Sequence, residues 1–495
     1  MRLLSAVLVL LLAVPAAAQP TFTRGTLSDA ITEVLGNGDF RDASWGALVV
    51  DIATGERIYA SNEFRRFIPA SNVKLFTTAA VLDALGPDFR YTTRLYADGD
   101  VRGGTLHGSL VVRGAGDPTF GGRYTGGDLT QTFRAWADSL RARGVRRVTG
   151  RVVGDDDVFD DMGLGAGWSW DDLAFAYAAP VSGLQFGEGT VTLTTRGTAP
   201  GQPAALAVEP DLGGFVTLVN HTTTTADGPT TTAYARALAE NTYTVSSSLP
   251  VGAVATQALA VANPTDYFVR MLVATLRREG IEVDGDGVDV DTWGQRPAYD
   301  RLMRVATYRS PPMSAIVGVT NDDSNNLYAE SLMRTLGAYE GRDSGYFARG
   351  SFEAGWEAAR PILRRLGVDT DAITLADGSG LSNMNRTTPE ATVALLVGMY
   401  RHPRRDVWDA FYRSLPLGGF TGTLRTRYET GDARGNVRAK TGYISGARTL
   451  SGYVTTRTGR ILAFSLLCNH YSTRTARVNR AQDDVVELLA DYEGR

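Results

Sequence analysis

Cysteine and histidine are both scarce in this chain of 495 residues, and each shortage excludes a class of protein. Cys468 is the only cysteine, so no disulfide can form within the chain. It lies in an apolar run, residues 461–468, and we expect it to be a small buried core residue. None of the four histidines stands in a Gly-x-Ser-x-Gly or His-Glu-x-x-His context. A serine–histidine hydrolase of that type and a zinc protease are therefore not indicated, and we expect no metal and no cofactor.

Lysine is the scarcest charged residue. Among 50 basic residues only Lys74 and Lys440 are lysines, so arginine carries the ordinary surface charge. Arginine stays protonated in proteins, whereas a lysine amine can lose its proton when its pKa is lowered. The two lysines therefore mark positions where a titratable amine is useful.

The overall composition is that of a folded protein without a nucleic-acid partner. Hydrophobic residues make up 43% and charged residues 21% of the chain, and the net charge is -4. The charge leaves no basic field to attract nucleic acid. The length is too great for one hydrophobic core and predicts two or three domains.

The first 18 residues have the pattern of a secretory signal peptide. Arg2 precedes an apolar run at residues 3–14, and small residues follow at 15–18. The run is too short for a permanent membrane anchor, although an uncleaved anchor is the alternative. We expect cleavage after Ala18 and export to the periplasm or cell envelope, without a stable membrane anchor.

The pattern of the chain changes twice. Residues 19–90 contain a predicted hairpin and then a largely buried helix after Ser71. Residues 91–291 are rich in Gly, Thr and Asp and show short alternating apolar segments, with isolated helices near 130–143 and 266–279. Helical periodicity returns from Met303, and the chain ends in a hairpin and a helix at 475–492. We predict a multidomain α/β (α+β) protein. One domain is formed by 19–90 and 292–495, and the β-rich insertion at 91–291 forms two subdomains.

Three short motifs carry the chemistry, and together they use both lysines. They are Ser71-Asn72-Val73-Lys74, Ser324-Asn325-Asn326 and Lys440-Thr441-Gly442. Each motif alone is weak evidence, but this order is the one found in β-lactamases and penicillin-binding proteins. A serine hydroxyl is a weak nucleophile and needs a neighbouring base. One helical turn separates Ser71 from Lys74, so the amine of Lys74 can act as that base when burial and a second cation, Lys440, lower its pKa.

The other motif residues predict substrate contacts. Ser324 can relay a proton to the leaving group, and Asn326 can hold a substrate amide. Lys440 and Thr441 can bind a substrate carboxylate, and Gly442 can let the strand backbone approach the substrate. The backbone N–H groups of Ser71 and Tyr443 are the candidate oxyanion donors.

The motifs and further segments resemble one family. Segments 69–74, 114–118, 167–172, 177–182, 325–330 and 377–382 resemble the D-alanyl-D-alanine carboxypeptidase/endopeptidase family of low-molecular-mass class C penicillin-binding proteins, peptidase family S13. The resemblance implies a penicillin-binding/β-lactamase-like transpeptidase domain with β-rich domains inserted between the Ser-x-x-Lys and Ser-x-Asn motifs. Tyr443 is a departure, since a small hydroxyl residue is frequent there, and it bears on substrate fit.

This resemblance implies hydrolysis of the D-Ala-D-Ala bond of peptidoglycan stem peptides, possible D,D-endopeptidase activity, and inhibition by β-lactam antibiotics. The alternatives are a β-lactamase or esterase of the same fold and a penicillin-binding sensor without turnover. The resemblance also suggests that Asp160 or Asp161 meets the free ammonium of a diaminopimelate side chain, with a solvated loop as the alternative. We expect the acidic run at residues 155–157 to be a solvated turn.

Overall fold

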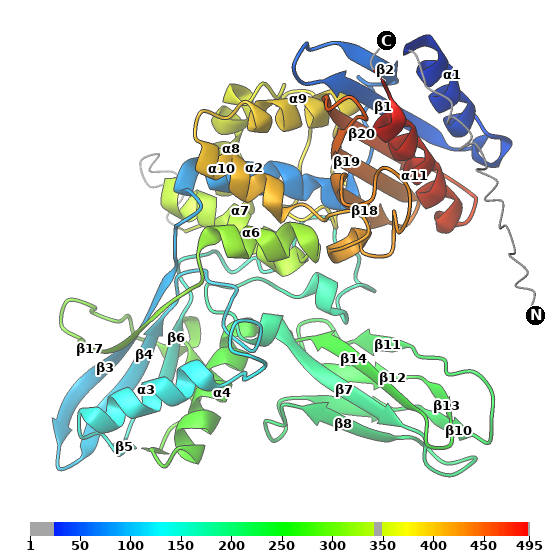
Figure 1. The fold of residues 1–495 in the computed structure, drawn as a ribbon. Coiled ribbons are helices and arrows are strands. Elements are labelled where there is room, and N and C mark those ends of the chain that lie inside the picture. The colour runs from blue at the N-terminus through cyan, green and yellow to red at the C-terminus, as the bar shows by residue number, and fades with distance from the viewer. Residues whose placement is uncertain (1–23, 341–348, 494–495) are drawn as a thin grey trace, which may run out of the picture.

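The structure is a computed structural model that describes residues 24–340 and 349–493 (Figure 1). The predicted signal peptide, residues 1–18, lies outside the described residues. Figure 1 shows two halves: a helix-rich half that contains both ends of the described chain, and a strand-rich half formed by the middle of the chain. None of the helices in the described part combines the length and the apolar character that a membrane span requires.

A five-stranded antiparallel sheet joins the two ends of the chain. Its strand order is β18-β19-β20-β1-β2. The N-terminal strands are β1 (Ser44–Asp51) and β2 (Arg57–Ser61), and the C-terminal strands are β18 (Arg438–Ile444), β19 (Ala447–Thr455) and β20 (Ile461–Asn469). Trp45 of β1 pairs with Cys468 of β20, which is fully buried as expected. The predicted hairpins are therefore confirmed, and the first domain is built from both ends of the chain.

Helices cover both faces of this sheet. On one face, α1 (Arg24–Leu35) and α11 (Thr475–Asp491) pack together, with α11 over β19 and β20 and α1 beside β2. On the other face, α9 (Pro389–Tyr400) contacts the sheet, and the buried helix α2 (Val73–Leu85) packs against its neighbours. The other helices of this domain are α6 (Met313–Asp322), α7 (Asn326–Glu340), α8 (Phe352–Arg365) and α10 (Arg405–Ser414).

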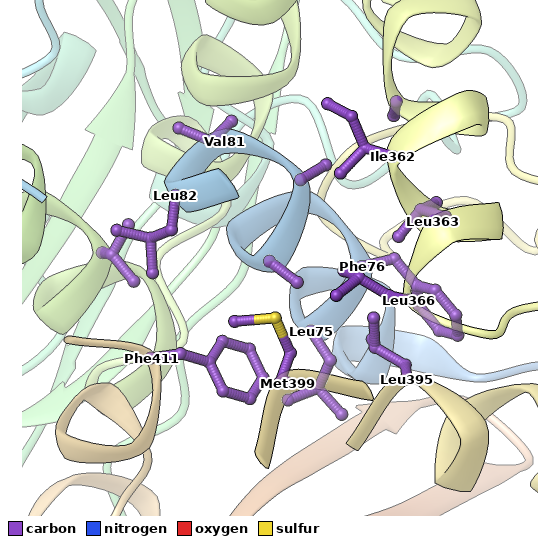
Figure 2. Packing of buried hydrophobic residues seen from close by; sticks show 14 of the residues in the cluster. Leu75, Phe76, Val81, Leu82, Ile362, Leu363, Leu366, Leu395, Met399 and Phe411 are labelled. Atoms are coloured by element: carbon purple, nitrogen blue, oxygen red, sulfur yellow. The ribbon is translucent and has the colours of Figure 1, made fainter. Parts of the chain in front are cut away.

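The central helix α2 is mostly apolar and is buried on all sides over residues 73–82, because it lies inside the domain. Leu75, Phe76 and Leu82 are fully buried. Figure 2 shows them among side chains of α8, α9 and α10, such as Leu363, Met399 and Phe411. A helix that is apolar all round is stable only where it is surrounded by protein. This enclosure fixes the direction in which the residues before and at the start of α2 point.

The first part of the insertion is a seven-stranded sheet with two helices packed on it. Its main path is β15-β5-β4-β3-β17, while β6 pairs with β4 and β16 pairs with β6. The strands are β3 (Thr92–Arg102), β4 (Thr105–Arg113), β5 (Arg147–Val148), β6 (Val152–Asp155), β15 (Glu282–Val283), β16 (Gly287–Asp289) and β17 (Met303–Arg309). The helices α3 (Gln131–Ala142) and α4 (Pro264–Arg278) contribute to its core, while the short α5 (Val290–Trp293) follows β16.

The sheet extends past residue 291, where the sequence analysis ended the insertion. Residues 303–309 form β17, which pairs antiparallel with β3. The side chain of Val305 is buried, whereas the other residues of β17 are half-buried or exposed. Such an edge strand carries too little apolar periodicity to be told from the start of a helical region. The pairing therefore moves the return to the first domain to about residue 310.

The second part of the insertion consists of small sheets. One contains β7 (Thr190–Arg196), β8 (Ala205–Glu209) and β14 (Val254–Ala260), and a second contains β9 (Thr217–Asn220), β11 (Tyr234–Arg236) and β12 (Thr242–Val245). The third pairs β10 (Thr223–Thr225) with β13 (Ser248–Pro250). One buried cluster runs from the seven-stranded sheet into β7, β12 and β14. The two parts therefore share a core, and their division into two subdomains stays a prediction.

Candidate active site

The first motif lies in a tight turn at the start of α2. Ala70, Ser71 and Asn72 form a short 3₁₀ helix, η2, that leads directly into α2. Ala70 has a positive φ of 46°, a conformation that non-glycine residues seldom adopt. The Nζ of Lys74 lies 3.1 Å from the Oγ of Ser71. The turn and the helix therefore bring the predicted nucleophile and its predicted base to hydrogen-bond distance.

Lys74 is fully buried, so its charge is shielded from bulk solvent. Its Nζ donates to the Oδ1 of Asn326 at 2.6 Å and to the backbone carbonyl of Ser379 at 2.7 Å. Burial lowers the pKa of Lys74 to about 7, against the opposing effect of the Asp377 and Glu330 carboxylates. Near neutral pH a substantial fraction of this amine is neutral, so it can accept a proton from Ser71.

The other lysine meets the serine of the second motif. Lys440 projects from β18, and its Nζ donates to the Oγ of Ser324 at 2.9 Å and to the carbonyl of Thr441 at 2.9 Å. Burial, followed by the charges of Lys74 and Arg448, lowers the pKa of Lys440 well below its usual range. We expected burial and the cation of Lys440 to lower the pKa of Lys74. Burial is the cause that lowers it, and burial also lowers the pKa of Lys440.

The second motif sits between α6 and α7. Ser324 has a positive φ of 61°, and Asn326 is the first residue of α7. The amide of Asn326 is shared: its Oδ1 accepts from Lys74, and its Nδ2 donates to the backbone carbonyl of Tyr177 at 2.7 Å. Tyr177 belongs to the insertion, so both halves of the molecule contribute to the site. The role of Asn326 toward a substrate amide stays a prediction.

Gly442 is required by packing, while its expected approach to the substrate stays a prediction. A Cβ at this position would lie 2.2 Å from the Oγ1 of Thr449, 2.8 Å from the carbonyl oxygen of Pro69 and 3.0 Å from the nitrogen of Ser71. Glycine is thus required because β18 packs closely against the turn that holds Ser71. The residues on either side of Gly442 do not share this close packing. The hydroxyl of Thr441 donates a hydrogen bond to the hydroxyl of Thr423 at 2.8 Å, and Tyr443 is 56% exposed.

Asn72, the second residue of the first motif, joins this turn to the sheet. It is fully buried, its Nδ2 donates to the carbonyl of Lys440 at 2.9 Å, and its Oδ1 accepts from Ser451 at 2.7 Å. A buried amide with both ends bonded holds its surroundings in one arrangement. The sequence motif contained this residue but gave no reason for it.

The loop at residues 377–382 supplies the carbonyl that Lys74 contacts, and the sequence analysis assigned it no role. The carboxylate of Asp377 accepts from the backbone N–H groups of Gly380 at 2.7 Å and Ser382 at 2.6 Å. The carboxylate of Glu330 accepts from the N–H groups of Gly378 at 2.9 Å and Ser379 at 2.8 Å. Burial raises the pKa of Glu330 to about 7. The only signal for this loop in the sequence was its resemblance to a family segment.

Asp160 and Asp161 are engaged in ion pairs. Asp160 lies 3.6 Å from the Nε of the buried Arg334, and Asp161 lies 3.0 Å from Nη1 of Arg349. Burial raises the pKa of Asp160, and Arg334 opposes that effect. Both aspartates line a cavity of about 630 Å³ with Met162 and other residues of the insertion. The structure does not bring them into contact with the three motifs, and their proposed specificity role stays a prediction.

The acidic run at residues 155–157 is not the solvated turn that we expected. Asp155 is buried at the end of β6 and accepts from the hydroxyl of Tyr299. Among the described residues, Asp156, Asp289 and Asp291 place carboxylate oxygens within 4.8 Å of one another, a spacing that could hold a metal ion. Acidic groups of this kind are common without an ion, so the cluster alone does not indicate a metal.

Comparisons with known proteins identify one family. The sequence model of the D-Ala-D-Ala carboxypeptidase 3 (S13) family matches residues 27–492. A D-alanyl-D-alanine carboxypeptidase of Actinomadura sp. (strain R39) is 34% identical over 463 residues, which cover 90% of this chain and 81% of that protein. A penicillin-sensitive carboxypeptidase A of Dictyostelium discoideum is 26% identical and covers 86% of this chain and 83% of that protein.

A solved structure has the same fold. Penicillin binding protein 4 (dacB) from Haemophilus influenzae superposes with a TM-score of 0.80 at 25% sequence identity, covering 94% of this chain and 99% of that chain. The match covers the inserted strands together with the helix-rich half. The predicted fold class, a transpeptidase-type domain with β-rich insertions, is therefore confirmed.

Proposed function

The chain belongs to the D-Ala-D-Ala carboxypeptidase 3 (S13) family and is a serine-type D-alanyl-D-alanine carboxypeptidase, and we propose that Ser71 is its nucleophile and Lys74 its base. The observation that carries this proposal is the pairing of each buried lysine with a motif serine. Lys74 Nζ lies 3.1 Å from Ser71 Oγ, and Lys440 Nζ lies 2.9 Å from Ser324 Oγ.

The acylation step follows from these contacts. The neutral amine of Lys74 takes the proton of Ser71, whose Oγ attacks the carbonyl carbon of the penultimate D-Ala. The terminal carboxylate of the substrate lies beside Lys440 and Thr441, and its negative charge favours the protonated form of Lys440. The oxyanion is held by the backbone N–H groups of Ser71 and Tyr443.

The leaving group then departs as the tetrahedral intermediate collapses. Ser324 passes a proton to the nitrogen of the terminal D-Ala and takes one from Lys440, to which it is hydrogen-bonded, and the D-Ala is released. The proton that Lys74 took from Ser71 replaces the one that Lys440 gave, so both lysines and Ser324 return to their starting states. Water hydrolyses the ester on Ser71 and regenerates the enzyme. A β-lactam ring opens by the same attack and leaves a penicilloyl ester on Ser71, which is the basis of the inhibition.

Peptidoglycan stem peptides are the substrate class that we propose, acted on outside the cytoplasm after removal of residues 1–18. The same chemistry applied to a D-Ala–diaminopimelate cross-link would give D,D-endopeptidase activity. Asp160 and Asp161 are the residues that we propose to read a diaminopimelate ammonium. Both are paired with arginines, so binding of the ammonium has to compete with Arg334 or Arg349.

Labelling with penicillin tests the proposed nucleophile. Intact mass should rise by one penicillin, peptide mapping should place the label on Ser71, and Ser71→Ala should abolish it. Labelling of another serine would overturn the assignment. Release of D-Ala from a D-Ala-D-Ala peptide separates the carboxypeptidase from a sensor that acylates without turnover. Fast release of penicilloate without D-Ala release would favour the β-lactamase alternative.

A further inference from the structure

The turn that carries Ser324 needs support from outside its own helices. Ser324 has a φ of 61°, in the left-handed region that costs a non-glycine residue of order 1–3 kcal/mol, and such residues persist only where their surroundings hold them. Its two neighbours, Asp323 and Asn325, both direct side chains to residues of the insertion. The support for this turn therefore crosses from one half of the molecule to the other.

Two residues of the insertion make these contacts. Arg123 follows β4, and its Nη1 donates to the Oδ2 of Asp323 at 2.7 Å. Glu188 precedes β7, and its Oε2 accepts from the Nδ2 of Asn325 at 2.9 Å. Arg123 and Glu188 are joined to each other through Nε and Oε1 at 2.5 Å. They form one unit that holds the residue before Ser324 and the residue after it.

Further contacts fix this unit in place. The guanidinium of Arg123 lies 5.9 Å from the ring centre of Tyr328, a buried residue of α7. The hydroxyl of Tyr124 donates to the carbonyl of Ala315 in α6 at 3.3 Å. Glu188 is itself in the left-handed region with a φ of 56°. In Figure 1, α6 and α7 lie on the side of the helix-rich half that faces the insertion.

We propose that Arg123 and Glu188 are positioning residues for acylation: from the insertion, they hold the turn so that Ser324 stays against Lys440. This inference rests on the proposed role of Ser324 in catalysis. It gives the insertion a part in the reaction itself. A single-domain enzyme with the same three motifs would have to hold this turn by other means.

We expect Arg123 and Glu188 to affect the position of Ser324 and not the stability of the protein. The side chains of Arg123, Glu188 and Asp323 are 34%, 30% and 45% exposed. Ion pairs this exposed contribute little to stability, so their loss should leave the protein folded. A displacement of about 1 Å at a catalytic group, in contrast, can cost roughly 100-fold in rate. Loss of the unit should therefore lower kcat much more than it changes KM or the melting temperature.

The test uses Arg123→Gln in the full-length protein, with Arg147→Gln as the matched control. Arg147 is also an arginine of the insertion paired with an exposed aspartate, Asp284, at 2.9 Å, but this pair lies in the seven-stranded sheet. We expect Arg123→Gln to lower kcat for a D-Ala-D-Ala peptide and the second-order acylation rate for penicillin by about tenfold or more, with KM within about twofold. Arg147→Gln should leave both rates unchanged.

A normal acylation rate in Arg123→Gln would overturn the inference, and so would an equal loss in Arg147→Gln. Should Arg123→Gln fail to fold, Asp323→Asn breaks the same ion pair from the other side: a tenfold loss supports the inference and a normal rate overturns it. Ser324→Ala separates the two proposals. If Ser324→Ala acylates normally, the proposed function of Ser324 fails; if it is inactive while Arg123→Gln is normal, only the positioning role fails.

Discussion

The two lysine–serine pairs of the site use the same side chains but are supported in different ways. Ser71 and Lys74 lie in a buried turn and helix, and Lys74 is held by Asn326 and by the loop at residues 377–382. Ser324 lies in a turn whose neighbours are held by partly exposed residues of the insertion. The pair that starts the reaction is thus held mainly by the domain's own core. The pair that we propose to finish it depends on the other half of the molecule.

The largest difference between the pairs should appear on replacing each lysine with arginine. Lys74 has to become neutral to accept a proton, which arginine cannot do, so Lys74→Arg should lose about 10²–10⁴-fold in acylation rate. Lys440 acts beside a substrate carboxylate, where a fixed cation is sufficient, so Lys440→Arg should retain measurable acylation at a reduced rate. The measurement is the second-order rate with penicillin, with folding checked by thermal melting. Complete loss in both folded variants would show that Lys440 does more than supply a positive charge.

A methyl group at Gly442 should disturb the Ser71–Lys74 pair, and thus the acylation rate, more than it disturbs the overall fold. Gly442→Ala places a Cβ against Thr449 and the backbone of Pro69, so the turn that holds Ser71 has to shift. We expect a loss of about tenfold or more in acylation rate and a destabilisation of roughly 1–3 kcal/mol. Gly318→Ala in α6 is the control, since a Cβ there meets nothing within 4 Å. Unchanged acylation in Gly442→Ala would show that the turn tolerates the shift.

The pH dependence should reveal the titration of Lys74. Acylation requires its neutral form, and its pKa is lowered to about 7, so the rate should rise with pH through about 7 and then level off. Glu330 is one of the carboxylates that raise the pKa of Lys74. In Glu330→Gln the rise should therefore move to lower pH. The shift should be a fraction of a unit, because burial already raises the pKa of Glu330 to about 7.

The control for this pH profile is Glu357→Gln, which removes an exposed carboxylate paired with Arg360 on α8. Its profile should match that of the unmodified enzyme. A rise that stays in place in Glu330→Gln, or that moves to higher pH, would contradict the assignment of the titrating group to Lys74.

The smallest effect should come from the aspartates of the insertion. Asp161→Ala removes a side chain that is 66% exposed and paired with Arg349, so stability and penicillin acylation should be nearly unchanged. If Asp160 and Asp161 read a diaminopimelate ammonium, Asp160→Ala and Asp161→Ala should lower the preference for diaminopimelate-ending peptides over analogues that lack this ammonium. An unchanged preference in both variants would remove them from the substrate site.

Much of the fold could be predicted because its elements have strong local patterns. The helix after Ser71, the terminal hairpin and the last helix were all expected from apolar periodicity, and the structure confirms them. The strand β17 was not predicted, because a single buried valine gives no clear hydrophobic periodicity. The close packing of Gly442 could not be predicted, because the neighbours of a strand, here Thr449 and Pro69, cannot be identified from the motif itself.

The amino-acid sequence is sufficient to identify the reactive groups, which are the two motif serines and the two lysines, because a helical turn brings residues three apart together. The protonation state and the contacts of those groups depend on the folded structure. Lys74 contacts Asn326 and Ser379, which are 252 and 305 positions away in the chain, and burial among such neighbours lowers its pKa. The same is true of Arg123 and Asp323, 200 positions apart. Residue type and local spacing are written in the chain, whereas desolvation and long-range contacts exist only once the chain has folded.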